Sequence, residues 1–184
     1  MTTLMERIGN ERRRLRNVRQ RMAAAIEAGA NGNEEFVPFY VAAADYIDQT
    51  MQRLHDQDVK MGKMIVEKVE RVDDNVKQAL KELDARLEGA KQHLEPFLAA
   101  RDALRERGSA ALEDFEKAAR TYSDFIVANM GHHGVTNDLS VKLFSRDDWE
   151  YMAGISDEQS ARDERLFNAV VETMPEGVDE PKES

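Results

Sequence analysis

The stretch QRLHDQDVKMGKMI, residues 52–65, decides the fold prediction. Its apolar positions include Met61 and Ile65, four residues apart, which is the spacing of side chains on one face of a buried α-helix. His55 and Asp58 fall on or beside that face, where apolar residues are expected. Burying an unpaired carboxylate costs on the order of several kcal/mol. Both polar residues therefore need partners from elsewhere in the chain.

Composition places the chain among single-domain globular proteins. It has 184 residues, no cysteine and a formal net charge of −10. The length suffices for one core, and the lack of cysteine excludes disulfides, thiolate metal sites and thiol catalysis. We find no apolar run long enough to span a membrane and no secretory signal, so a cytoplasmic protein is expected. The acidic charge disfavours nucleic acid as the main partner.

One segment departs from this acidic balance. Residues 11–21, ERRRLRNVRQR, are rich in arginine. Such a cluster could bind phosphate, or it could be a solvated helix face that complements acidic neighbours. Leu15 and Val18 lie between the arginines at helical spacing, which favours an amphipathic core helix.

The chain as a whole is predicted to be all-α. Proline and glycine are sparse, and no convincing strand alternation is present. We predict helices over residues 4–28, 35–69, 74–105, from 109 to about 129, and 156–173, the last opened by the capping-box sequence SDEQ. Short connections between long helices favour an antiparallel up-down-up-down four-helix bundle with an additional short C-terminal helix. This single domain covers residues 1–174, and residues 175–184 are expected to form a disordered tail.

The apolar stripes of the four long helices predict which residues face the core. Each stripe steps by three, four or seven positions. Four residues are expected to face inward near mid-height: Leu15, Met51, Leu83 and Tyr122. Glu11 and Asp58 interrupt two of these stripes, and His133 lies at the end of a third.

These polar interruptions are predicted to share one layer of the bundle. In antiparallel neighbours, turn positions determine which residues lie at equal height. Glu11 should be level with about residue 54, and His55 with residues near 85 and 131. Glu11, His55, Asp58, His132 and His133 then fall within one or two helical turns. Such a layer could form a proton-sharing hydrogen-bond network, or it could hold iron, manganese or zinc, which accept oxygen and imidazole ligands.

The chain resembles the hemerythrin-like (HHE cation-binding) family of four-helix bundles over roughly residues 4–150. The resemblance rests on DYIDQTMQRLHDQD (45–58), HHGVTND (132–138) and LFSRDDW (143–149). That family binds two irons through histidines and carboxylates from all four helices. His133 and Asp138 match its motif of a histidine followed five residues later by an aspartate, and His55 matches the histidine of its His-x-x-x-Glu motif.

The resemblance implies a metal in the core, iron above all, and a role in binding or sensing dioxygen, nitric oxide or iron. The family's histidines on the first and third helices are missing here, so one labile ion is expected more readily than a stable pair. The candidate ligands are Glu11, His55, Asp58, His132, His133 and Asp138. A small diatomic molecule would be the partner, and association with a second copy or another protein stays open.

Other interpretations of the same residues stay open. His55 could be a boundary histidine that hydrogen-bonds to a carboxylate, and Glu11 could pair with arginines around it. His132 and His133 flank a glycine-bracketed bend, where a loop role is natural. The chain could therefore be a metal-free helical scaffold or interaction protein on the same fold. A metal-dependent enzyme on the same bundle is the third alternative.

Overall fold

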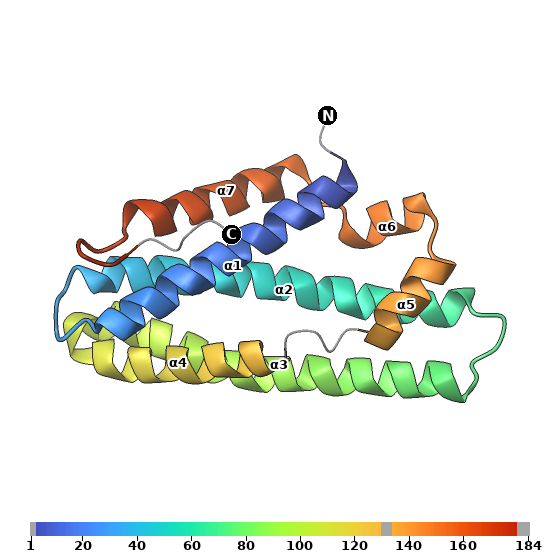
Figure 1. Cartoon of the computed structure of the whole chain (residues 1–184), viewed down its shortest axis with the longest axis horizontal. Coiled ribbons are helices and arrows are strands. Elements are labelled where there is room, and N and C mark those ends of the chain that lie inside the picture. Colours follow the sequence, from blue (N-terminus) through green and yellow to red (C-terminus); the bar gives the residue numbers. More distant parts are fainter. Residues whose placement is uncertain (1–2, 130–133, 180–184) are drawn as a thin grey trace.

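The structure is a computed structural model, which describes residues 3–129 and 134–179 and is all-helical over them (Figure 1). The all-α prediction is confirmed. The helices are α1 (Leu4–Ala28), α2 (Phe36–Lys68), α3 (Asp74–Arg107), α4 (Leu112–Asn129), α5 (Gly134–Leu143), α6 (Arg146–Ala153) and α7 (Asp157–Glu172), with a 3-10 turn at Gly108–Ala111. The predicted ranges agree with α1 to α4 and with α7 to within a few residues. Helices α5 and α6 were not predicted.

Local capping explains several of these boundaries. The predicted capping box at the start of α7 is present, since the Gln159 amide donates to Ser156 Oγ at 3.2 Å and the Ser156 amide donates to Gln159 Oε1 at 3.0 Å. Helix α1 ends at Gly29, whose φ of 74° lies in the region that glycine adopts most easily. Both signals depend only on neighbouring residues, so they can be read from the sequence.

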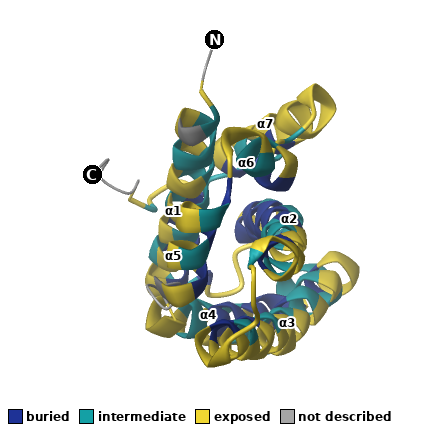
Figure 2. Ribbon diagram, turned by 90° about the vertical axis from the view of Figure 1, so that its right-hand side faces the viewer, coloured by how far each residue is buried: buried dark blue, intermediate teal, exposed yellow. Residues whose placement is uncertain are grey.

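Helix α2 lies at the centre of the molecule (Figure 2). It packs against α1, α3 and α7, and α4 packs against α3. The chain reverses direction between α1 and α2, between α2 and α3, and between α3 and α4 (Figure 1). Helix α4 covers only the C-terminal half of α3. Helices α5 and α6 lie near the C-terminal end of α2.

The apolar core consists of two clusters. The larger one joins α1, α2, the C-terminal half of α3, α4 and α7, and its fully buried members include Phe39, Phe97 and Phe115. The smaller one joins the end of α2 and the start of α3 to Phe144 and α6. The four residues expected to face inward pack in these clusters: Leu83 and Tyr122 are buried, and Leu15 and Met51 are partly buried against the larger cluster.

Helix α7 belongs to the larger cluster through the fully buried Val170. After α7 the chain continues along the body, because Pro175 is buried and Val178 packs against the same cluster. Pro175 and Val178 thus contact the packed body, and residues 180–184 of the expected tail lie outside the described residues.

Asp148 connects α6 to the end of α2. Its carboxylate accepts hydrogen bonds from Lys68 Nζ at 2.9 Å and from the amide and hydroxyl of Ser145, each at 2.8 Å. The hydrogen bond from Lys68, followed by those from Ser145, lowers the pKa of Asp148 from 3.8 to about 2.

We expect D148N to lower the melting temperature near neutral pH and to have a much smaller effect near pH 2. The pKa is lower in the folded than in the unfolded state, so the carboxylate stabilises the fold fully above pH 3.8, and its contribution is lost as the pH falls through about 2. Thermal melts of both proteins across this range test the prediction. D147N, at an exposed position in the same first turn, is the matched control. An equal effect of D148N at both pH values would show that the ionised Asp148 carboxylate is not the source of the stabilisation.

Candidate functional site

Glu11, the polar residue of the α1 stripe, contacts an arginine of α2. Arg53 Nε donates to Glu11 Oε1 at 2.9 Å, and Arg53 Nη2 reaches the same oxygen. On its other side, Arg53 Nη1 lies 2.6 Å from Asp163 Oδ2 of α7. The three side chains are only 17%, 8% and 11% exposed for Glu11, Arg53 and Asp163. We call Glu11, Arg53 and Asp163 the arginine bridge.

The arginine bridge keeps its central guanidinium charged. Burial lowers the pKa of Arg53, but hydrogen bonds and charge attraction from Glu11 and Asp163 outweigh this and raise it overall. Burial also raises the pKa of the neighbouring Tyr46 to about 12, with further contributions from Asp163 and Glu11, so this phenol is neutral at physiological pH. The bridge is thus a fixed ion-pair network that links α1, α2 and α7.

A cavity of about 240 Å³ lies beside the arginine bridge. Glu11, Asp163 and Tyr46 form part of its wall, and Arg7 and Arg14 of α1 form another part. These two arginines add positive charge to a wall that also contains the two carboxylates. The cavity can hold water or a small polar molecule, and it has no surplus of negative charge with which to attract a cation.

Asp58 has an arginine neighbour of its own. Arg86 Nη2 of α3 lies 3.4 Å from Asp58 Oδ2, and the two side chains are 18% and 30% exposed. Asp58 follows Arg53 by five residues, which is about 140° around the axis of α2. Glu11 therefore meets α2 on the side of α1 and α7, whereas Asp58 faces α3. The structure brings each carboxylate to a guanidinium, on two different sides of α2.

The remaining predicted ligands lie apart from the arginine bridge or outside the described chain. His55 is exposed on α2, and Asp138 is exposed on α5. His132 and His133 lie outside the described residues. Across residues 3–129 and 134–179, no three histidine, aspartate or glutamate side chains are grouped so that they could hold a metal ion. The metal assignment of the His133 and Asp138 motif stays a prediction.

The sequence analysis allowed Glu11 to pair with arginines around it, but it did not identify Arg53 of α2 or Arg86 of α3 as the partners of these carboxylates. Arg53 lies three residues after Thr50 and seven after Tyr46, and both of those residues are buried. That helical spacing was a usable signal, because it places the arginine on a core-facing stripe. The predicted polar layer contains only carboxylates and histidines. The sequence gives no comparable signal for Asp163, because it does not show where α7 packs.

A scan against protein-family models gave no match, and searches of curated proteins and of solved structures gave no match either. In the part of the chain that the structure describes, no helix has both the length and the apolar character needed to cross a membrane.

Proposed function

We propose that this chain is a metal-independent helical interaction protein, built as an up-down-up-down bundle whose core carboxylates are neutralised by arginine. The arginine bridge is the observation that carries the proposal. Its guanidinium supplies, between carboxylates of α1 and α7, the positive charge that a bound cation would otherwise supply. A planar guanidinium is well suited to this task because it can hold carboxylates on more than one edge.

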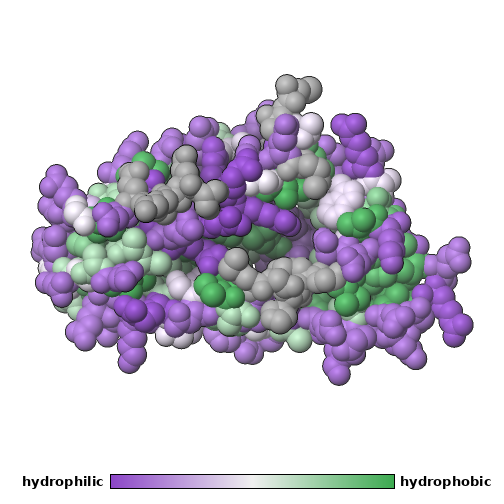
Figure 3. Space-filling model, in the orientation of Figure 1, coloured by the Kyte–Doolittle hydropathy of each residue, from purple (hydrophilic) through white to green (hydrophobic). Residues whose placement is uncertain are grey.

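The surface near α5 supports a role in protein contacts. Val135 and Val141 of α5 are 48% and 63% exposed. Apolar side chains gather around α5 on the face shown in Figure 3. Exposed apolar area of this kind is a common property of surfaces that contact another protein. The partner in this proposal is another protein or a second copy of the chain.

We expect the protein, purified without chelator, to show equal melting temperatures in iron(II), zinc(II) and EDTA. A ligand that binds only the native state at about 100 times its dissociation constant would stabilise it by about 2.7 kcal/mol. Such a gain would be visible in a thermal melt. Elemental analysis of the same preparation should find no stoichiometric metal. A metal-dependent rise in melting temperature would contradict the proposal.

Metal binding is the second candidate, and the packing of α5 favours it. Helix α5, which carries Asp138, packs against α2, which carries His55 and Asp58. The hemerythrin-like resemblance adds iron, with dioxygen or nitric oxide as the bound molecule, and a metal-dependent enzyme would need the same site. In this case D58N and H133A should each abolish a metal-induced rise in melting temperature. A near-ultraviolet oxo-bridge absorption band after loading with iron would favour this candidate over the first.

A further inference from the structure

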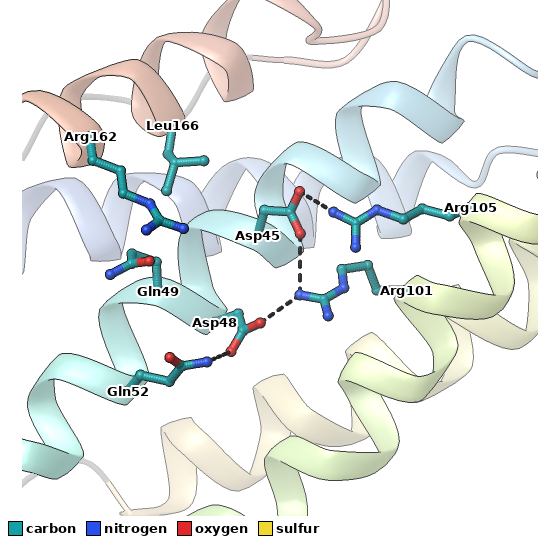
Figure 4. A pocket seen from close by; sticks show the side chains of 8 residues that line it. All are labelled: Asp45, Asp48, Gln49, Gln52, Arg101, Arg105, Arg162 and Leu166. Atoms are coloured by element: carbon teal, nitrogen blue, oxygen red, sulfur yellow. Dashed lines mark hydrogen bonds and ion pairs between the residues drawn. The ribbon is translucent and has the colours of Figure 1, made fainter.

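A second cavity, of about 310 Å³, lies between α2, α3 and α7 (Figure 4). Asp45 and Asp48 of α2, Arg101 and Arg105 of α3, and Arg162 of α7 form its polar wall. Its volume falls at the lower end of the range of small-molecule sites, roughly 300–1,000 Å³.

One side of this cavity is an ordered network of ion pairs. Arg101 Nη1 lies 2.7 Å from Asp48 Oδ2 and 3.2 Å from Asp45 Oδ1, and Arg105 Nη2 contacts the other oxygen of Asp45. Arg101 Nε donates to Asp102 at 3.0 Å. Arg101 is 11% exposed and Asp48 is 17% exposed, so the centre of the network is shielded from solvent, whereas Arg105 and Asp102 at its edge are 45% and 59% exposed. The carboxylates in this wall already have cationic partners and leave little attraction for a further cation.

Arg162, on the opposite side, is not part of that network. Its side chain extends from α7 toward the cavity and Gln49. Among the side chains labelled in Figure 4, neither Arg162 nor Gln49 forms a hydrogen bond or ion pair with another. An arginine guanidinium presents five N–H donors in a planar fork. Leu166, one turn further along α7, adds an apolar surface. Arg162 is exposed and Gln49 is partly buried, so this side of the cavity offers a ligand the solvated guanidinium and the side-chain amide as hydrogen-bond donors.

From this arrangement we infer that the cavity between α2, α3 and α7 binds a small monocarboxylate, with Arg162 as the anion-binding residue. A planar carboxylate matches the guanidinium fork with two parallel hydrogen bonds. The Gln49 amide can donate to the same anion, and the apolar part of the ligand can pack on Leu166. A phosphate dianion is disfavoured because the cavity offers only one guanidinium outside the ion-pair network, which balances a single negative charge. This inference does not depend on the proposed function.

Titration of the full chain with butyrate tests this inference, with arginine and glutamine side-chain signals followed by NMR at constant ionic strength. We expect saturable shifts of Arg162 and Gln49 signals, with a dissociation constant on the order of 1–10 mM. R162Q should weaken binding about tenfold or more because it removes the charge-assisted pair. R165Q is the matched control, since Arg165 is exposed on the same helix and does not line the cavity. It should bind butyrate as the wild type does.

Three results would overturn the inference. One is the absence of saturable shifts at butyrate concentrations up to about 0.1 M. Another is an equal loss of affinity in R162Q and R165Q, which would indicate general charge screening. The third is inorganic phosphate binding as tightly as butyrate, which would exclude a site specific for monocarboxylates.

Discussion

Replacing Arg53 with methionine is expected to lower the free energy of unfolding by about 3–5 kcal/mol. The substitution leaves Glu11 and Asp163 close together in a poorly solvated position, without the guanidinium that now pairs with both. Removing one member of a buried ion-pair network is costly because the remaining charges lose their partner but stay shielded from water. At roughly 2–4 °C per kcal/mol for a chain of this size, the melting temperature should fall by about 6–20 °C.

Two further variants separate charge from packing in this experiment. R165M makes the same chemical change at an exposed position of α7 and should alter stability by less than about 0.5 kcal/mol. The triple variant E11Q, R53M, D163N removes all three charges and should recover much of the stability lost in R53M. Urea unfolding gives the free energy of unfolding of R53M, R165M and the triple variant. If R53M were as stable as R165M, the arginine bridge would have no structural importance.

The second large effect is expected for F97A, which should destabilise the protein by about 3–5 kcal/mol. Phe97 of α3 is fully buried in the larger cluster. Its ring stacks on Tyr122 of α4, with centroids 4.9 Å apart and planes 10° from parallel, and lies 5.6 Å from the ring of Phe115. Truncation loses apolar burial and leaves a cavity that the rigid helix pair cannot fill by collapse.

F97L is the matched variant for this position, because leucine retains most of the apolar volume and should lose clearly less stability than alanine. V127A controls for truncation at the exposed end of α4, where Val127 is 60% exposed, and should stay within about 0.5 kcal/mol of wild type. Equal stability of F97A and V127A in urea unfolding would mean that the contact between α3 and α4 is not part of the stable core.

Axial position along the helices was largely predictable from the sequence. The equal-height estimate placed Glu11 level with about residue 54, and in the structure it contacts Arg53. Height depends on where the connections lie and on the constant rise per residue, and both can be read from the chain. The rotation of each helix about its axis is different, because it depends on how all the neighbouring side chains pack. For this reason Glu11 and Asp58 were expected in one network but face different sides of α2.

The sequence by itself determined the all-α class, the ends of the long helices and the caps at Ser156 and Gly29, because these depend on periodicity and on residues a few positions apart. Only the tertiary structure decided that α7 packs on α2 and contributes Asp163 to the arginine bridge. It alone also showed the cavity that Arg162 faces (Figure 4). These features bring residues of α7 next to residues of α1 and α2 that lie more than a hundred positions earlier in the chain, and no local pattern specifies which distant side chain will neutralise a buried charge.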